Sequence, residues 1–147
     1  MIKLQNNIII KIILISIISI LASCADAKNN YIYVVPHSIY EFSYEESETV
    51  ELTERMIEFL DHLAVAMQND KQFIAEISGH SDNTADGATN LKRAITRAEN
   101  AASYLKKIGV DSERIKVFNK GTREPITHQN DEKSQALNRR LEIKMTH

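Results

Sequence analysis

The sequence is poor in cysteine, glycine and proline, and it has no excess of positive charge. It contains one cysteine, four glycines and two prolines among 147 residues. One cysteine cannot form an internal disulfide, so the fold must depend on a hydrophobic core. Gly79 and Gly87 flank one loop but form no phosphate-binding motif, and no serine lies in the G-x-S-x-G turn that exposes a nucleophile. We therefore predict a protein without cofactors that is not an enzyme.

The charge balance is slightly acidic. Lys and Arg number 18 and Asp and Glu number 20. Removal of residues 1–23, predicted below, takes away Lys3 and Lys11 and leaves 18 − 2 = 16 basic residues against 20 acidic ones, a net charge of −4. Binding to nucleic acid requires a basic surface that collects phosphate contacts, so nucleic acid is not an expected partner. Adhesion to anionic lipid by charge is equally unexpected.

The amino terminus has the features of a bacterial lipoprotein signal peptide. Lys3 and Lys11 precede an apolar run, residues 12–22, of about 11 residues, which is about half of what a membrane-spanning helix needs. The run ends in Leu21-Ala22-Ser23-Cys24, which resembles a lipobox, and Cys24 would carry the diacylglyceryl group. We predict a signal peptide at residues 1–23. The alternatives are an uncleaved signal anchor, or a simple signal peptide that is cut nearby.

Lipidation at Cys24 would attach the chain to a membrane through its acyl chains. Two or three chains make such anchoring stable, at about 0.8 kcal/mol per buried methylene. Residues 24–37 form a short tether that spans at most about 45 Å when fully extended. Ala25, rather than aspartate, follows the cysteine, which in enteric bacteria is compatible with transport to the outer membrane. The domain would then lie in the periplasm.

Residues 38–147 are predicted to form one α/β domain. Strands are expected at 39–44, 72–78, 115–118 and 140–145, with Lys120-Gly121 turning out of the third. One helix is expected to open within residues 45–49 and to stop at Asn69-Asp70. A second is expected at 88–107, closed by Gly109, and residues 132–137 form a short helix at most. Alternating strands and helices predict an α/β sandwich with two main helices on one four-stranded mixed sheet.

Each main helix has one apolar stripe at helical spacing. The stripe of the first comprises Met56, Ile57, Leu60, Leu63, Ala64 and Met67, and that of the second comprises Leu91, Ala94, Ile95, Ala98, Ala102 and Leu105. Asn90 and Arg97 lie two turns apart, within about 20° of each other and roughly 90° from the centre of the second stripe. Asp82 precedes this helix in a loop, so an acid and a guanidinium are expected to face each other across a groove at a strand end.

The spacing of four short motifs resembles a known family. Gly79-His80-Ser81-Asp82 is followed by Asn90, by Arg97-Ala98 and, near the end, by Asn138-Arg139-Arg140. The series is similar to the G-H-[TS]-D, N, R-A and N-R-R pattern of OmpA-like peptidoglycan-binding domains, and its layout is that of the peptidoglycan-associated lipoproteins. The resemblance covers residues 38–146 and implies a βαβαββ-type fold. The usual Leu-Ser of the family is replaced here by Arg93-Ala94.

The resemblance also implies roles for individual residues. Asp82 would bind the ammonium group, and Arg97 the carboxylate, of diaminopimelate in a peptidoglycan stem peptide, through charge-assisted hydrogen bonds. Asn90 would assist, and Thr84 would supply a nearby hydroxyl. The family further implies a tether between membrane and cell wall. The alternative is a periplasmic protein-interaction module, with Tol-type, secretion or motor proteins as partners.

Three points stay open in the sequence. Asp82 and Arg97 could form an ordinary internal salt bridge with each other. Arg139 and Arg140 start a strand and so point to opposite sides of the sheet; Arg140 is favoured for the groove near Asp82. His80 and Asp82 could instead be two metal ligands, with His37, His62 or His128 as the third, although no second paired motif supports this.

Overall fold

A computed structural model of the chain describes residues 39–46 and 48–147. The predicted signal peptide, Cys24 and the tether lie outside these residues. The strands are β1 (Ile39–Ser43), β2 (Ile74–His80), β3 (Ile115–Gly121) and β4 (Arg140–Thr146). The helices are α2 (Glu54–Asn69), α3 (Gly87–Lys107) and α4 (Glu132–Asn138), with a short 3-10 turn, η1 (Ser112–Arg114), before β3. None of the helices in this described part has the length and apolar character to span a membrane.

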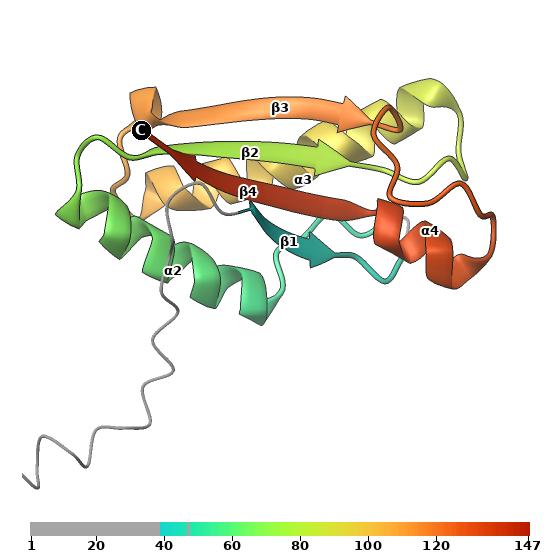
Figure 1. The fold of residues 1–147 in the computed structure, drawn as a ribbon, viewed down its shortest axis with the longest axis horizontal. Helices are drawn as coiled ribbons and strands as arrows, with labels where there is room; N and C mark the ends of the chain where they lie inside the picture. The colour runs from blue at the N-terminus through green and yellow to red at the C-terminus, as the bar shows by residue number, and fades with distance from the viewer. Residues whose placement is uncertain (1–38, 47) are drawn as a thin grey trace, which may run out of the picture. The chain divides into compact units, whose positions relative to one another are not determined.

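The four strands form one mixed sheet in the order β1-β4-β2-β3. β4 is antiparallel to both β1 and β2, and β2 is parallel to β3. The strands β1, β2 and β3 therefore run in the same direction, and the segments that follow them meet at one edge of the sheet. The start of β4, preceded by α4, lies at this same edge (Figure 1). The predicted α/β sandwich with two main helices on a four-stranded sheet is confirmed, and this edge is where all four motifs come together.

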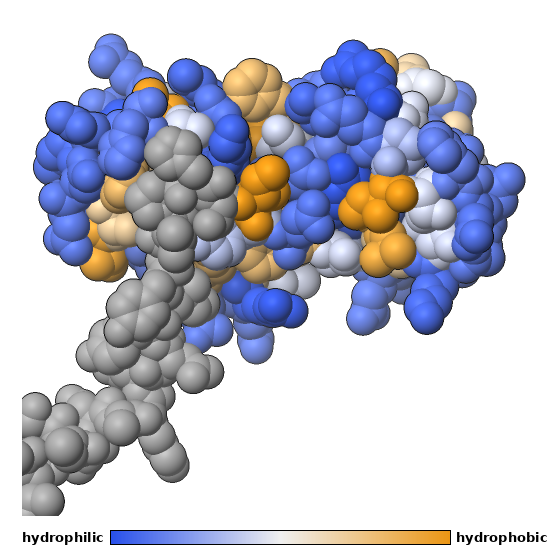
Figure 2. All heavy atoms as spheres, in the orientation of Figure 1, coloured by the Kyte–Doolittle hydropathy of each residue, from blue (hydrophilic) through white to orange (hydrophobic). Residues whose placement is uncertain are grey.

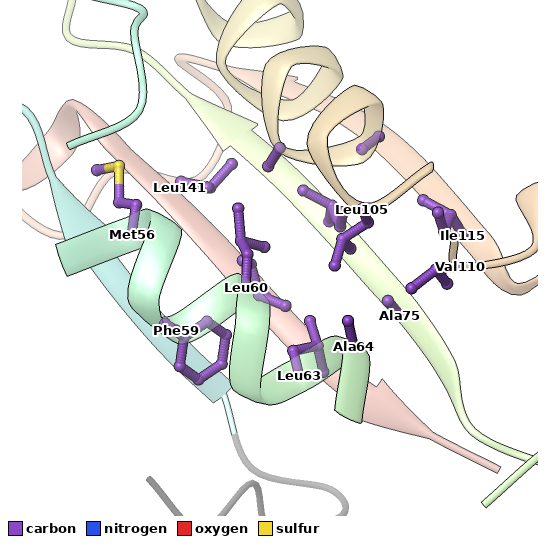
Figure 3. Packing of buried hydrophobic residues seen from close by; sticks show 14 of the residues in the cluster. Met56, Phe59, Leu60, Leu63, Ala64, Ala75, Leu105, Val110, Ile115 and Leu141 are labelled. Carbon is purple, nitrogen blue, oxygen red and sulfur yellow. The ribbon is translucent and has the colours of Figure 1, made fainter. Parts of the chain in front are cut away.

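The core lies between the sheet and the pair α2 and α3. Alternate residues of each strand point into it, because successive side chains of a strand face opposite sides. β2 contributes Ala75 and Ile77, and β4 contributes Leu141 and Ile143, all with no exposed surface. Figure 3 shows the α2 side chains, including Leu60 and Leu63, directed into the same layer as residues of the sheet and of α3. Burial of a side chain of the size of Leu60 or Leu63 contributes roughly 1.5–3 kcal/mol. The core layer is therefore the main source of stability for the sheet.

The opposite face of the sheet is not covered by α2 or α3. Its side chains alternate with those of the core and include Glu76, Lys120, Glu142 and Lys144, together with exposed Phe118. Figure 2 shows this side of the molecule, on which hydrophilic residues prevail and hydrophobic residues appear as separate spots. The described residues on this view form no broad apolar surface of the kind that marks an obligate interface.

The largest differences from the expected element boundaries are at the first main helix and the third strand, while β2 spans residues 74–80 instead of 72–78. The first main helix begins at Glu54, capped by the hydroxyl of Thr53, and not within residues 45–49. The acidic run was a misleading start signal, because a cap requires an acceptor immediately before the apolar stripe. The third strand continues to Gly121, whose φ of 56° ends it. In α3, Leu91 is 41% exposed, and Ala101 takes a place in the buried stripe that the periodicity did not assign to it.

Candidate functional site

Asp82 lies just after β2 and is almost completely buried, with 1% of its surface exposed. Its Oδ2 accepts a hydrogen bond from Nη1 of Arg139 at 2.8 Å. Its Oδ1 accepts from the hydroxyl of Thr84 at 2.8 Å and from the backbone N–H of Thr84 at 3.4 Å. Burial by itself would raise the pKa of Asp82, but the hydrogen bonds from Arg139 and Thr84 outweigh it and hold the pKa below its ordinary value. The carboxylate is therefore charged at neutral pH.

Arg139 connects Asp82 to the segment that follows β1. It is 1% exposed. Its Nε donates to the carbonyl of Tyr44 at 3.1 Å, and its Nη2 donates to the carbonyl of Glu45 and to the carboxylate of Glu132. One guanidinium thus joins the β2–α3 loop, the β1–α2 segment and α4.

Arg97 is the second buried cation of this edge, with no exposed surface. It projects from α3, and its Nε and Nη2 both donate to the carbonyl of Thr49, at 3.0 and 2.8 Å, while Nη1 donates to the carbonyl of His80 at 2.9 Å. Its Cζ lies 4.5 Å from the centre of the Tyr44 ring, a cation–π contact. Burial lowers the pKa of Arg97 to about 10, so it remains charged at neutral pH.

Tyr44 closes the site on the side of α2. Burial raises its pKa to about 12, so the hydroxyl keeps its proton. This hydroxyl has no hydrogen-bond partner among the described residues. A hollow of about 370 Å³ lies against Tyr44 and Thr49, the two residues that contact Arg97 from this side. The sequence analysis missed Tyr44, and its place in the aromatic alternation of β1 could have revealed it.

Asn90 holds the loop between β2 and α3. Its amide donates to the carbonyl of Ala85 at 2.8 Å and its Oδ1 accepts from the hydroxyl of Ser81 at 3.5 Å. The start of α3 is further fixed by Asp86, whose carboxylate accepts from the N–H of Thr89. Asn90 therefore shapes the loop that presents Asp82 and Thr84.

The structure brings Asp82, Thr84, Asn90 and Arg97 to one edge of the sheet, as the spacing predicted. The ion-pair partner of Asp82 among the described residues is Arg139, so the direct Asp82–Arg97 salt bridge is not the arrangement found. Asp82 and Arg97 still attract each other across the site. Arg97 is buried more deeply than its expected position on the shoulder of the helix implied.

The expectation that Arg140 lies near Asp82 is wrong, because its neighbour Arg139 occupies that place. Arg140 points to the other side of the sheet, where its guanidinium contacts Glu142 at 2.6 Å and the carbonyl of Glu124 at 3.1 Å. The sequence predicted that Arg139 and Arg140 point to opposite sides of the sheet, but it did not determine which of the two points towards Asp82. Arg93, the departure from the family pattern, lies 3.5 Å from the carboxylate of exposed Glu48.

No three His, Asp or Glu side chains gather as a possible metal site within residues 39–46 and 48–147. His80 instead lies beside Glu142, with 3.3 Å between Nε2 and Oε2, and it forms no hydrogen bond of normal geometry there. His37 lies outside the described residues.

His80 is expected to make the stability of the fold depend on pH. Burial and the nearby Arg140 lower its pKa from 6.5, while Glu142 and Glu124 act in the opposite direction. Because the pKa of His80 is lower in the folded than in the unfolded state, folding favours the neutral imidazole. The contribution of His80 to the free energy of unfolding is therefore complete above about pH 6.5, and it is lost as the pH falls towards the pKa of the folded state.

We expect the free energy of unfolding, measured by urea titration, to fall between pH 7.5 and pH 5.5. The fall should be smaller in a His80→Asn variant, because that variant has no imidazole to protonate. A His62→Asn variant is the control, because it removes a histidine that does not lie beside Glu142 and Arg140. An equal pH slope in the His80 variant and in wild type would contradict the assignment.

Fold and site together define a class: a small α/β domain with a buried acid and two buried arginines at one sheet edge. The OmpA family model matches residues 44–139. The chain belongs to the OmpA family.

Individual relatives agree with this assignment. The chain is 28% identical over 115 residues to a peptidoglycan-associated lipoprotein of Legionella pneumophila, across 78% of this chain and 64% of the relative. The fold is that of the crystal structure of the peptidoglycan-associated lipoprotein from Burkholderia pseudomallei, with a TM-score of 0.67 at 22% identity over 71% of this chain and 88% of that one. It is also that of the C-terminal domain of Helicobacter pylori MotB, with a TM-score of 0.66 at 21% identity over 75% and 86% of the two chains. The chain spans less than two thirds of the length of the Legionella relative.

Proposed function

We propose that this domain binds peptidoglycan without catalysing a reaction, and that it recognises the free zwitterionic end of diaminopimelate in a stem peptide. The observation that carries the proposal is that a charged, buried Asp82 and a charged, buried Arg97 lie at the same edge of the sheet without forming a salt bridge with each other. An ammonium and a carboxylate on one carbon match these two groups. Relatives that are named peptidoglycan-associated lipoproteins support peptidoglycan as the ligand.

Binding would replace internal contacts with contacts to the ligand. Arg97 now donates to the carbonyl of Thr49, so the ligand carboxylate would take the place of this carbonyl and form a stronger bond, in which donor and acceptor are both ionised. The ammonium would bind Asp82 beside Thr84, while Arg139 keeps the carboxylate charged and in position. The hollow against Tyr44 and Thr49 lies beside the carbonyl of Thr49.

Co-sedimentation with diaminopimelate-containing sacculi tests this proposal. Residues 26–147 contain every described strand, helix and core residue, so this soluble fragment is suitable. We expect Asp82→Ala and Arg97→Ala each to weaken binding by about 2–5 kcal/mol, because each leaves a ligand charge unpaired. Lys106→Ala is a matched control, since it removes an exposed cation from the last turn of the same helix.

Circular dichroism of each variant would show that the fold is retained. Binding of wild-type strength by both folded site variants would refute the zwitterion receptor. Failure of folded wild-type protein to sediment with sacculi would refute peptidoglycan binding altogether.

We propose further that acyl chains on Cys24 anchor the chain in the outer membrane, so that the periplasmic domain tethers membrane to cell wall. The lipobox-like sequence carries this part, and relatives named as lipoproteins support it. An intact-mass spectrum of the membrane-extracted chain should show acyl additions and the loss of residues 1–23. A water-soluble chain of unmodified mass would refute the anchor.

A protein-interaction role is the second candidate, because similar folds occur in proteins as different as MotB and the peptidoglycan-associated lipoproteins. Tol-type periplasmic proteins would be such partners. Capture of a defined partner that survives Asp82→Ala would mark a role independent of the zwitterion site.

A further inference from the structure

A polar cleft of about 330 Å³ lies beside the zwitterion site, at the same edge of the sheet. We use the name polar cleft for the space lined by Ser81, Asn83, Thr122, Arg123, Pro125, Thr127, His128, Gln135 and Asn138. Ser81 and Asn83 are the two neighbours of Asp82 in the chain. A volume of this size is at the lower end of the range for small-ligand pockets, about 300–1,000 Å³. The cleft is thus within reach of any ligand that Asp82 holds.

The walls of the cleft are fixed by internal hydrogen bonds. The Oδ1 of Asn138 accepts from the N–H groups of Ile126 and Thr127 at 2.8 and 3.2 Å, and its amide donates to the carbonyl of Thr127 at 2.9 Å. On the other wall, the N–H of Ser81 donates to the carbonyl of Gly121 at 2.9 Å. The β3–α4 segment and the β2–α3 loop are therefore held in place around the cleft, which limits the entropy lost on binding.

Gln135 is a buried residue of the cleft with an unpaired acceptor. It is 3% exposed, and its amide donates to the carbonyl of Gln129 at 3.1 Å and to the side chain of Asn130 at 3.3 Å. Its Oε1 is buried and has no hydrogen-bond partner among the described residues. A buried acceptor without a partner is destabilising. A ligand donor that reaches this oxygen would remove part of that cost.

The chemistry of the cleft favours a polar ligand group with N–H donors and C=O acceptors. Eight of its nine residues are polar, and no Phe, Tyr or Trp lines it. Its one arginine, Arg123, donates to the carbonyl of Asn119. Sugar rings are commonly bound against the faces of such large aromatic side chains, which this lining does not contain. Backbone amides of a peptide fit this lining better.

We propose that the polar cleft is a second subsite, which binds the peptide bonds of the stem peptide next to its diaminopimelate. The proposal rests on the proposed function, because Asp82 and Arg97 hold the zwitterion and the cleft holds the peptide that continues from it. The two subsites have different roles. Asp82 and Arg97 bind the charged groups of the diamino acid, and the polar cleft distinguishes a peptide-linked diamino acid from the free one.

Isothermal titration of residues 26–147 with three defined ligands tests the subsite. The ligands are free meso-diaminopimelate, the tripeptide L-Ala-D-Glu-diaminopimelate, and the same tripeptide attached to its disaccharide. We expect the tripeptide to bind more tightly than the free diamino acid. Asn83→Ala and Gln135→Met should each reduce the affinity for the tripeptide by roughly three- to tenfold, the value of one or two hydrogen bonds. Affinity for free diaminopimelate should not change.

Asn69→Ala is the matched control, because it removes an exposed asparagine from the end of α2. Asn83 is also exposed, so its variant reports on the cleft even where Gln135→Met disturbs folding. Equal binding of free diamino acid and tripeptide, or unchanged tripeptide affinity in Asn83→Ala, would overturn the subsite and leave the zwitterion receptor intact. A gain seen only with the disaccharide, and lost in the variants, would replace the peptide assignment with a sugar assignment. Failure of wild type to bind any of the three ligands would refute the proposed function itself.

Discussion

Gly79→Ala is expected to destabilise the domain severely, although it adds one methyl group. A Cβ at this position would lie 1.8 Å from the carbonyl oxygen and 2.7 Å from the carbonyl carbon of Ala94 in α3. These are backbone atoms, so no side-chain rotation relieves the overlap, and α3 must move away from β2. Overpacking of a rigid site typically costs about 1–3 kcal/mol and occasionally more. We expect a loss of about 3 kcal/mol or more in the free energy of unfolding.

The same displacement would reach the binding site. Arg97 follows Ala94 by one turn on α3, and the Arg97 guanidinium donates to the carbonyl of His80, the residue next to Gly79. A shift of α3 would therefore break this bond as well as loosen the core. We expect Gly79→Ala to lose binding to sacculi at a temperature at which part of the protein is still folded.

Thermal and urea unfolding measure the effect, with Gly87→Ala as the matched control. A Cβ on Gly87, the first residue of α3, meets no atom within 4 Å. This control should be neutral or more stable by up to about 1 kcal/mol, because alanine is the better helix former. A melting temperature of Gly79→Ala within about 2 °C of wild type, against the roughly 10 °C expected for a loss of this size, would show that the close approach of α3 to β2 is not required.

The layered fold could be predicted from sequence because it follows from periodicity. Leu60, Leu63 and Met67 of α2 and Ile77 of β2 repeat at the helix and strand periods and are all buried as expected. Boundaries were less certain where polar residues alone marked them. The acidic run at residues 45–49 resembled a helix start, yet its last residue, Thr49, instead accepts a hydrogen bond from Arg97 through its carbonyl.

The chemistry of the site could be predicted only in part. Spacing placed Asp82, Asn90 and Arg97 at one sheet edge, because two helical turns have fixed geometry and the loop that joins Asp82 to the helix is short. It could not determine which arginine pairs with Asp82, since Arg139 and Arg140 are adjacent and their phase depends on the exact start of β4. Nor could spacing reveal the polar cleft, because Gln135 and Thr122 come to line it only through the path of the segment between β3 and α4.

Arg139→Met is expected to have the second large effect. The variant keeps much of the side-chain volume but removes the cation, so Asp82 stays buried without its ion-pair partner. Breaking a buried pair in this way costs about 3–5 kcal/mol, because the remaining charge is uncompensated. The bonds from Arg139 to the carbonyls of Tyr44 and Glu45 are lost at the same time. Urea unfolding at pH 7 measures the loss, and Arg55→Met, which replaces an exposed arginine of α2, is the matched control.

The pH dependence of the loss of stability in Arg139→Met distinguishes two causes: an Asp82 carboxylate that stays buried without its ion-pair partner (a stranded charge), and a simple packing defect. In wild type the bonds from Arg139 and Thr84 keep the pKa of Asp82 low, so its stabilisation is present above the unfolded value of about 3.9 and is lost below it. Without the bond from Arg139, we expect the pKa of Asp82 to rise above its wild-type value, because burial favours the neutral form. Protonation should then remove the uncompensated charge as the pH falls. The destabilisation caused by Arg139→Met should therefore be smaller at pH 4.5 than at pH 7.

A second substitution makes the same distinction at constant pH. Asp82→Asn in the Arg139→Met background removes the stranded charge, and it should recover part of the lost stability, although Asp82→Asn alone destabilises wild type. Additive losses in the double variant, together with a difference between Arg139→Met and wild type that does not change with pH, would mean that Arg139 acts only through the carbonyls of the segment after β1. Recovery would instead establish that Arg139 stabilises the charge of Asp82, the group that we propose to recognise an ammonium.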